Sequence, residues 1–147
     1  MKKIIQKQLG ELLLENKIIT KEQLEEALRV QKEKGGLVGQ ILVALKYTTE
    51  VAIAQALTAQ YGFPYLPLTN YDIDTVAVKI IPEHVAKQFE LIAVDRVGNI
   101  LTLVMSNPLN FQAVEDVEML TKLTTQVFVS TATDIHKAIA DNYKGAK

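Results

Sequence analysis

The chain has 147 residues and a formal net charge of -1 at pH 7, and 48% of its residues are hydrophobic, so it can bury the core of one domain or of two small ones. This charge balance excludes a strongly basic nucleic-acid surface, and the absence of cysteine excludes disulfides and thiolate chemistry and favours a reducing cytoplasm. Polar residues such as Gln6, Lys7 and Glu11 interrupt the N-terminal apolar residues, and no run approaches the roughly 18 apolar residues of a membrane span, so we expect neither a signal peptide nor direct membrane insertion.

One sequence pattern occurs twice within the first sixty residues. The stretch LGELLLENKIITKEQLEEALRVQ (residues 9–31) aligns without gaps with VGQILVALKYTTEVAIAQALTAQ (residues 38–60). Gly10 then falls on Gly39, and Gln31 falls on Gln60. An internal repeat of this kind indicates a duplicated supersecondary unit.

Each copy is predicted to form a pair of helices. In the first copy, apolar residues from Ile5 to Leu13 recur at helical spacing, and Asn16 is expected to end that helix because asparagine tolerates the left-handed conformation. Thr20 and Gln23 have the spacing of a capping box at the start of the second helix. In the second copy, Thr49 is the expected cap and Gly62 the expected end.

The second helix of each copy carries an apolar stripe that ends in a glutamine. The stripes consist of Leu24, Ala27, Leu28 and Gln31 in the first copy and of Ile53, Ala56, Leu57 and Gln60 in the second. We expect Leu28 and Leu57 to be buried at equivalent places. A polar amide beside a core needs a partner, which is either a helix-end hydrogen bond or a ligand. The paired glycines likewise indicate either close helix packing or a ligand that approaches the backbone.

The two copies differ in charge. The first is densely charged, whereas the second contains only Lys46 and Glu50. Because a nearly uncharged helix pair is usually covered on more than one side, we expect the second copy to be enclosed by the first and by the C-terminal half, or by a partner.

The rest of the chain predicts a small sheet with helices. A Pro- and Tyr-rich extended connector (YGFPYLPLTNYDID) comes first, and Pro82 then begins a helix. Residues 89–96 and 99–106 are predicted to form a hairpin joined by VGN. Asn110 is then expected to cap a helix over residues 111–120, and residues 126–130 are expected to form a strand. Thr131 and Asp134 cap a final predicted helix, whose apolar face consists of Ile135, Ala138, Ile139 and Tyr143. The expected fold class is α+β, with an N-terminal four-helix unit of two tandem helix hairpins (1–62), a connector (63–81) and a small sheet with helices packed on one face (82–147).

Catalytic signatures are absent from the sequence. It contains no GxxxxGK[ST] phosphate loop and no GxGxxG after a strand. His84 and His136 have no second ligand at metal spacing and are interpreted as solvated surface residues. Glu115, Asp116 and Glu118 share a predicted helix and are interpreted as a solvated face in preference to a catalytic carboxylate pair. These features favour a binding or docking module over an enzyme.

The doubled pattern resembles the N-terminal domain of the ATPases that power type II secretion and type IV pilus assembly, whose motif is approximately RLGxxLVxxGxIxxxxLxxALxxQ, written twice with a five-residue spacer. The first copy keeps Leu9, Gly10, Leu13, Leu14, Ile19, Leu24, Ala27, Leu28 and Gln31, and the second keeps Gly39, Leu42, Val43, Ala56, Leu57 and Gln60, with Val38 and Ile53 as conservative replacements. YGFPYLPL and IPEHVAKQFELIAV are also similar to the family's continuation. The leading arginine is replaced by Gln8 and Leu37, and the turn glycines by Lys17 and Lys46.

The resemblance implies a regulatory and docking domain without catalytic activity. It would bind a protein of the inner-membrane platform, and would lie in the cytoplasm, peripheral to the inner membrane through that partner. The ATPase motor would lie in a C-terminal part outside this sequence. No cofactor and no nucleic acid are expected.

The alternative implied function is a cyclic di-GMP sensor that regulates the ATPase, because one branch of the family binds this two-fold symmetric nucleotide with its doubled motif. The residues at the implied ligand site are Gln8, Leu9, Gly10, Leu13, Leu14, Leu24, Leu28, Gln31, Leu37, Val38, Gly39, Leu42, Val43, Ile53, Leu57 and Gln60. The loss of arginine at positions 8 and 37 removes charge-assisted contacts from such a site.

Overall fold

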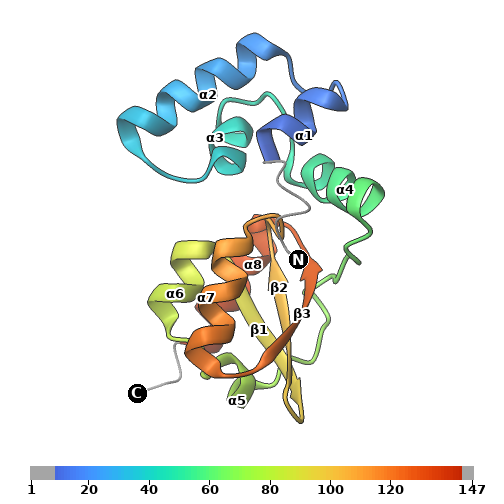
Figure 1. Ribbon diagram of the computed structural model, residues 1–147, viewed down its shortest axis with the longest axis vertical. Coiled ribbons are helices and arrows are strands. Elements are labelled where there is room, and N and C mark those ends of the chain that lie inside the picture. Colours follow the sequence, from blue (N-terminus) through green and yellow to red (C-terminus); the bar gives the residue numbers. More distant parts are fainter. Residues whose placement is uncertain (1–8, 144–147) are drawn as a thin grey trace.

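The computed structural model describes residues 9–143 as two packed halves. The tandem repeat forms α1 (Leu9–Glu15), α2 (Lys21–Lys34), α3 (Val38–Ala44) and α4 (Glu50–Tyr61). The second half contains α5 (Thr75–Val78), α6 (Glu83–Phe89), β1 (Leu91–Val97), β2 (Ile100–Met105), α7 (Phe111–Thr121), β3 (Thr124–Val129) and α8 (Ala132–Tyr143). Figure 1 shows α1 to α4 at one end of the molecule and the sheet with its helices at the other. The α+β class expected from the sequence is confirmed.

The ends of the helices follow local sequence signals. Thr20 accepts a hydrogen bond from the Gln23 backbone while the Gln23 side chain accepts one from the Thr20 backbone, so the predicted capping box is confirmed. Thr49 caps α4, and Gly62 ends it in the left-handed conformation (φ 73°). Among the described residues, no helix is long and apolar enough to cross a membrane.

The turn inside each repeat differs from the sequence-based expectation. The left-handed residue after α1 is Lys17 (φ 60°), not Asn16, and its counterpart in the second copy is Lys46 (φ 67°). The backbone N–H of Ile18 donates to the Leu13 carbonyl, and Lys17 donates to the Leu14 carbonyl, which is a Schellman motif. The same pair of bonds recurs in the second copy from residues 47 and 46 to residues 42 and 43. The Asn16 amide instead donates to the Leu12 carbonyl, while Ile5 and Gln8 lie outside the described residues.

The two equivalent leucines are not buried equally. Leu57 is fully buried, whereas Leu28 is 45% exposed, so the expected burial of Leu28 is wrong. The reason is the position of each helix: α4 contacts α1, α3 and β3, whereas α2 contacts α1 and α3 at the outside of the molecule. Ala27 is the buried residue of α2. The second copy packs against both the first copy and the C-terminal half, as expected, although Val51 of α4 remains 54% exposed.

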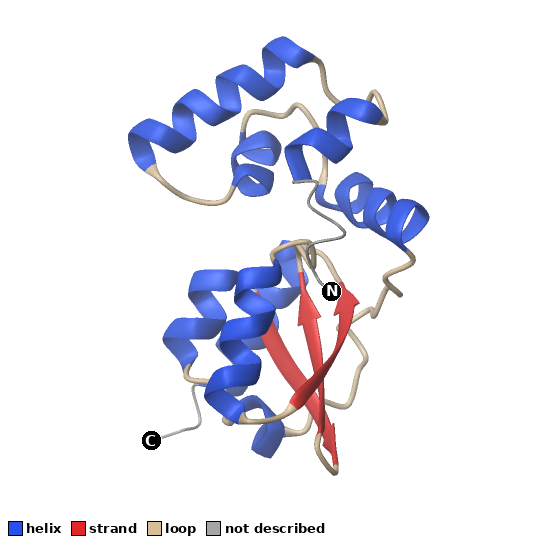
Figure 2. Ribbon diagram, viewed as in Figure 1, coloured by secondary structure: helices blue, strands red, loops and turns tan. Residues whose placement is uncertain are grey.

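The sheet has the strand order β1-β2-β3 and is mixed. The predicted hairpin is confirmed: β1 pairs antiparallel with β2, from Leu91 opposite Met105 to Val97 opposite Ile100. β3 pairs parallel with β2, and α7 forms the crossover between these two strands. Asn110 caps α7 as predicted, through a hydrogen bond from the backbone N–H of Ala113. Figure 2 shows the three strands side by side with helices around them.

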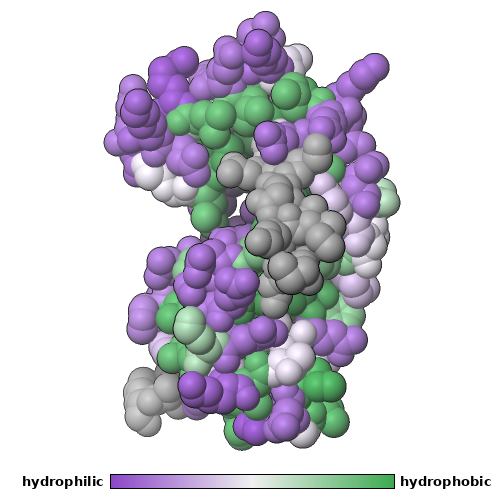
Figure 3. Space-filling view, in the orientation of Figure 1, coloured by the Kyte–Doolittle hydropathy of each residue, from purple (hydrophilic) through white to green (hydrophobic). Residues whose placement is uncertain are grey.

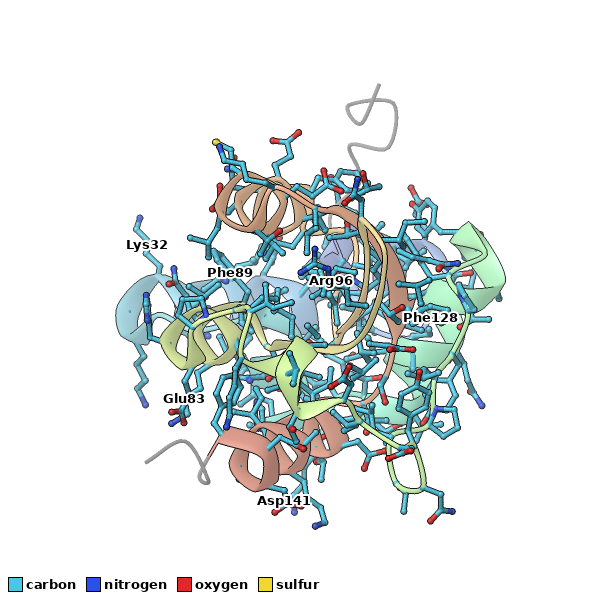
Figure 4. The ribbon with its side chains drawn as sticks, turned by 90° about the horizontal axis from the view of Figure 1, so that it is seen from below. Lys32, Glu83, Phe89, Arg96, Phe128 and Asp141 are labelled. Carbon is cyan, nitrogen blue, oxygen red and sulfur yellow. The ribbon has the colours of Figure 1, made fainter. Side chains whose placement is uncertain are left out.

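The sheet is covered more extensively than the single face expected from the sequence. The first four residues of β1, from Leu91 to Val94, are all fully buried although neighbouring side chains of a strand point to opposite faces. Figure 4, which looks along the strands, shows α7 and α8 on opposite sides of the molecule with strands between them. The core of this half is therefore built on both faces of the sheet.

The connector contributes to this core. Its first part is extended as predicted, and Tyr65 forms a parallel bridge with Val129 beside β3. Its second part holds α5, a helix that the sequence analysis did not predict, in which Ala77 and Val78 are buried. Asp74 caps α5 with its carboxylate and donates its backbone N–H to the Val94 carbonyl of β1, so the connector is anchored to the sheet.

The unequal burial of the repeat gives a matched pair of variants. Leu57→Ala should lower the free energy of unfolding by about 2–5 kcal/mol, because it empties space inside a packed core. Leu28→Ala should lower it by less than about 1 kcal/mol, because half-exposed positions tolerate truncation. Urea denaturation of both variants measures the difference, and equal losses would contradict the positions of α2 and α4 described above.

Tyr143 predicts a change of stability at alkaline pH. Its hydroxyl lies near the carbonyl oxygens of Val78 (3.0 Å) and Ile81 (2.7 Å), and burial, with the nearby Glu83 carboxylate, raises the pKa of Tyr143 to about 12. Folding favours the neutral phenol, so this contribution is complete below the pKa of about 10 of an unfolded tyrosine and is lost as the pH rises towards 12. The wild type should therefore lose more stability than Tyr143→Phe between pH 10 and pH 12 in urea denaturation. Parallel losses would contradict the role assigned to this hydroxyl.

Candidate functional site

A cavity of about 670 Å³ lies between the tandem repeat and the second half of the molecule. Figure 3 shows the surface hollowed between these two halves. Its wall on the repeat side includes part of the second motif copy, and its other wall comes from the ends of α6, β2 and β3 and the starts of α7 and α8. Phe89 of α6 lines it, and in Figure 4 this residue lies on the same side of the molecule as Lys32 of α2.

One wall of the cavity holds a buried carboxylate, Glu90. Glu90 ends α6 in the left-handed conformation (φ 57°) and is 2% exposed. Its carboxylate accepts hydrogen bonds from the side chains of Gln40 on α3 and Ser106 after β2, and His136 Nε2 lies 2.7 Å from Oε2. The side-chain nitrogens of Gln40 and His136 are 3.5 Å apart. A buried carboxylate is stable only when donors satisfy it, and here four segments of the chain meet to do so.

A second carboxylate, Glu50, joins the halves across the same cavity. Glu50 Oε1 accepts from the backbone N–H of Thr133 (2.8 Å), and Oε2 accepts from the Thr133 hydroxyl (2.7 Å). Glu50 is the first residue of α4, and Thr133 lies in the first turn of α8. A carboxylate at a helix N-terminus satisfies free N–H groups and interacts favourably with the helix dipole.

The charge of the cavity wall limits its ligands. Glu50 and Glu90 line it, and none of the described lining residues is lysine or arginine. A wall of this composition lacks the cations that usually bind phosphate groups. Over residues 9–143, no group of three or more His, Asp or Glu side chains is arranged to hold a metal ion.

The structure brings some of the motif residues to the cavity and places the others elsewhere, in the core of the repeat or, for Leu28 and Gln60, on its surface. Those that line the cavity are Leu9, Gln31, Leu37, Val38, Gly39, Val43 and Ile53. Those outside its lining are Gly10, Leu13, Leu14, Leu24, Leu28, Leu42, Leu57 and Gln60. Gln8 precedes the described part of the chain. The motif residues at the cavity thus come mainly from the second copy and not from both copies equally.

The motif glycines permit close packing between helices. A Cβ atom on Gly10 would lie 2.7 Å from Leu24 Cδ1, and one on Gly39 would lie 3.1 Å from Leu9 Cδ2. Both distances are shorter than ordinary van der Waals contact, so each glycine lets a leucine side chain approach the backbone.

The motif glutamines have partners inside the protein. Gln31 Nε2 donates to the Gly36 carbonyl (2.9 Å), and Gln60 Nε2 donates to Asn16 Oδ1 (3.0 Å). The first bond fixes the end of α2, and the second joins the end of α4 to the turn of the first copy. These contacts correspond to the helix-end alternative considered from the sequence.

Sequence reasoning missed the residues that join the halves. Gln40, Glu50, Glu90 and Ser106 were not identified as site residues. His136 is 53% exposed, in agreement with its interpretation as a surface residue, but the contact of its ring with the buried carboxylate was not expected. The available signal was Glu90 itself, a charged residue directly before the apolar run LIAV.

The acidic cluster of α7 has structural partners. Asp116 accepts from the Gln112 amide (2.8 Å), and Glu118 accepts from the backbone and hydroxyl of Thr125 (2.9 and 2.8 Å). Glu115 is exposed. These contacts support the non-catalytic interpretation of the cluster.

Comparison with known proteins finds a matching family and full-length relatives. A family model described as the MshEN domain matches residues 61–147, which is more than half of the chain. The type IV pilus assembly ATPase PilB of Myxococcus xanthus is 32% identical over 135 residues, covering 92% of this chain and 24% of the relative. PilB of Thermus thermophilus is 30% identical over 139 residues, covering 93% of this chain and 16% of the relative. The chain therefore spans a quarter or less of the length of these relatives.

Two solved structures share the fold. The structure of MshE with cdg (cyclic di-GMP) has a TM-score of 0.69 and 28% identity, covering 93% of this chain and 99% of that one. The structure of the N-terminal domain of XpsE has a TM-score of 0.69 and 20% identity, covering 90% of this chain and 92% of that one. The chain has the fold of these N-terminal domains over nearly its whole length.

The glutamine contacts lead to a stability prediction. Gln31→Ala and Gln60→Ala should each lower the free energy of unfolding by less than about 1 kcal/mol, because their hydrogen bonds lie at exposed helix ends. Urea denaturation, with Leu57→Ala as the reference for a buried position, measures the effect. A loss as large as that of Leu57→Ala would mean that the amides satisfy buried groups.

Proposed function

The chain belongs to the MshEN domain family, and from this we propose that it is a non-catalytic regulatory and docking domain of a type IV pilus assembly or type II secretion ATPase. It would bind the cytoplasmic part of an inner-membrane platform protein and couple that protein to the ATPase domain. Its place would be the cytoplasm, held peripherally at the inner membrane by this partner. The similarity to PilB and to the N-terminal domain of XpsE supports the proposal.

The observation that carries the proposal is that residues of the duplicated motif contact other parts of the repeat itself. Its glycines admit leucine side chains, and its glutamines bond to other parts of the repeat. Because these motif residues stabilise the fold, we infer that the domain is a scaffold whose surface binds other proteins. The acidic cavity wall is consistent with this and does not favour a phosphate-rich ligand.

The docking surface that we propose is the apolar end of the second half. Val97 and Ile100 pair at the hairpin tip and are 72% and 46% exposed, and Met119 and Leu120 at the end of α7 are 67% and 53% exposed. The backbone N–H of Thr124, just after α7, donates to the Asn99 carbonyl in the hairpin turn, so the two elements lie side by side. A group of exposed apolar side chains of this kind is typical of protein interaction surfaces.

The docking proposal is tested by titrating the protein with the cytoplasmic domain of a platform protein. Val97→Asp and Met119→Asp should each weaken binding by about tenfold or more, because a carboxylate in an apolar contact stays unpaired. Leu28→Asp, at the opposite end of the molecule, is the matched control and should leave affinity unchanged. Absence of association with the wild type at about 100 µM would contradict the docking function.

Cyclic di-GMP binding is the second candidate, and the similarity to the structure of MshE with cdg favours it. Without arginine at the leading motif positions and without a cation among the described cavity residues, calorimetry with about 100 µM cyclic di-GMP should give no binding heat for the wild type. The double variant Gln8→Arg, Leu37→Arg should gain measurable binding, because it restores the charge-assisted contacts. Binding by the wild type would instead make this chain a nucleotide sensor.

A further inference from the structure

Besides the apolar packing of Leu109 and Val129 on the helical core, the tandem repeat contacts the second half at two polar points, and both involve side chains of the second copy. Gln40 of α3 donates to the buried carboxylate of Glu90, and Glu50 of α4 accepts from the backbone and hydroxyl of Thr133. All of these residues except Thr133 line the cavity, so the contacts lie at its wall.

The Glu90 carboxylate, which accepts the hydrogen bond from Gln40, is positioned by contacts within the second half. Glu90 is fixed by its left-handed backbone at the end of α6 and by Ser106 and His136, which contact its carboxylate from the same half of the molecule. A preorganised buried acceptor binds a donor with little loss of side-chain freedom. Within the described part of the tandem repeat, Gln40 is therefore the residue that completes a cluster otherwise formed by the second half.

The first copy of the motif could not make these contacts. The alignment of the copies places Glu11 at the position of Gln40 and Lys21 at the position of Glu50. A glutamate at the position of Gln40 would bring a second carboxylate against the buried Glu90, and a lysine at the start of α8 would oppose the helix dipole. The two copies are thus distinguished at the positions that contact the second half.

We propose that the Gln40–Glu90 and Glu50–Thr133 contacts form a two-point latch that holds the tandem repeat closed against the second half without any ligand. Glu90 acts in it as a positioning residue, and the latch determines which copy of the motif docks. An occupant that enters the cavity between α3 and α8 has to compete with Gln40, so opening of the latch couples the cavity to the arrangement of the two halves. This inference does not depend on the proposed function.

Hydrogen–deuterium exchange of the whole chain tests the latch. Gln40→Glu places a second carboxylate against Glu90 and should speed exchange about tenfold or more in α3 and in the first turn of α8, while amides in β2 keep their protection. Gln55→Glu makes the same chemical change on the exposed side of α4 and should exchange like the wild type. Unchanged exchange in Gln40→Glu would overturn the proposal.

A rescue variant separates a latch from general destabilisation. Gln40→Glu combined with Glu90→Gln again places one carboxylate opposite one amide, and protection in α3 and α8 should return to within about threefold of the wild type. If Gln40→Glu does not fold, Gln40→Ala and Glu50→Gln take its place, and each should loosen α3 and the start of α8 without affecting β2. Loss of protection in β2 to the same extent, or failure of the rescue, would show that the contact only stabilises the fold as a whole.

Discussion

A buried carboxylate is the interaction on which the assembly of this protein depends. Glu90 is the one charged residue among those that the structure describes as buried, and it receives contacts from α3, from the end of β2 and from α8. Taking a carboxylate out of water is costly unless its oxygens are satisfied, so the elements that supply the donors have to be in place together. This requirement fixes the end of α6, the end of the sheet and the position of the tandem repeat relative to both.

The two copies of the motif share their backbone conformation but lie in different environments. The threonine N-caps and the Schellman turns recur in both copies, with a lysine in the left-handed conformation in each turn. The side chains differ where the environments differ: the first copy exposes charged residues and Leu28, whereas the second buries Leu57 and supplies Gln40 and Glu50 to the second half. Of the two helix hairpins, the first therefore forms the outer layer of the molecule, and the second forms the contact with the C-terminal half.

Local features of the fold could be predicted from sequence, and long-range ones could not. The Thr20 capping box, the Asn110 cap and the hairpin around Gly98 depend on residues close together in the chain, where propensity and hydrogen bonding decide the outcome. The exposure of Leu28 depends on which helix covers α2, and periodicity identifies an apolar face without identifying what packs on it. The Glu90 cluster joins residues from 40 to 136, and no short motif links them. The motif indicated one wall of the cavity, but the opposite wall, which includes Glu90, is assembled from segments that are far apart in the sequence.

The helical core also has consequences for the order in which the chain can fold. Leu109 and Val129 belong to the same apolar cluster as Leu12, Leu42 and Leu57, although they come from the loop before α7 and the end of β3. The hairpin β1–β2 closes across a short turn, whereas the parallel pairing of β3 with β2 spans the whole of α7, and such non-local pairing is slow. The core of the tandem repeat is therefore completed only after the last strand has joined the sheet. During synthesis, the repeat leaves the ribosome before the second half, so part of its apolar surface stays uncovered until Leu109 and Val129 have been synthesised.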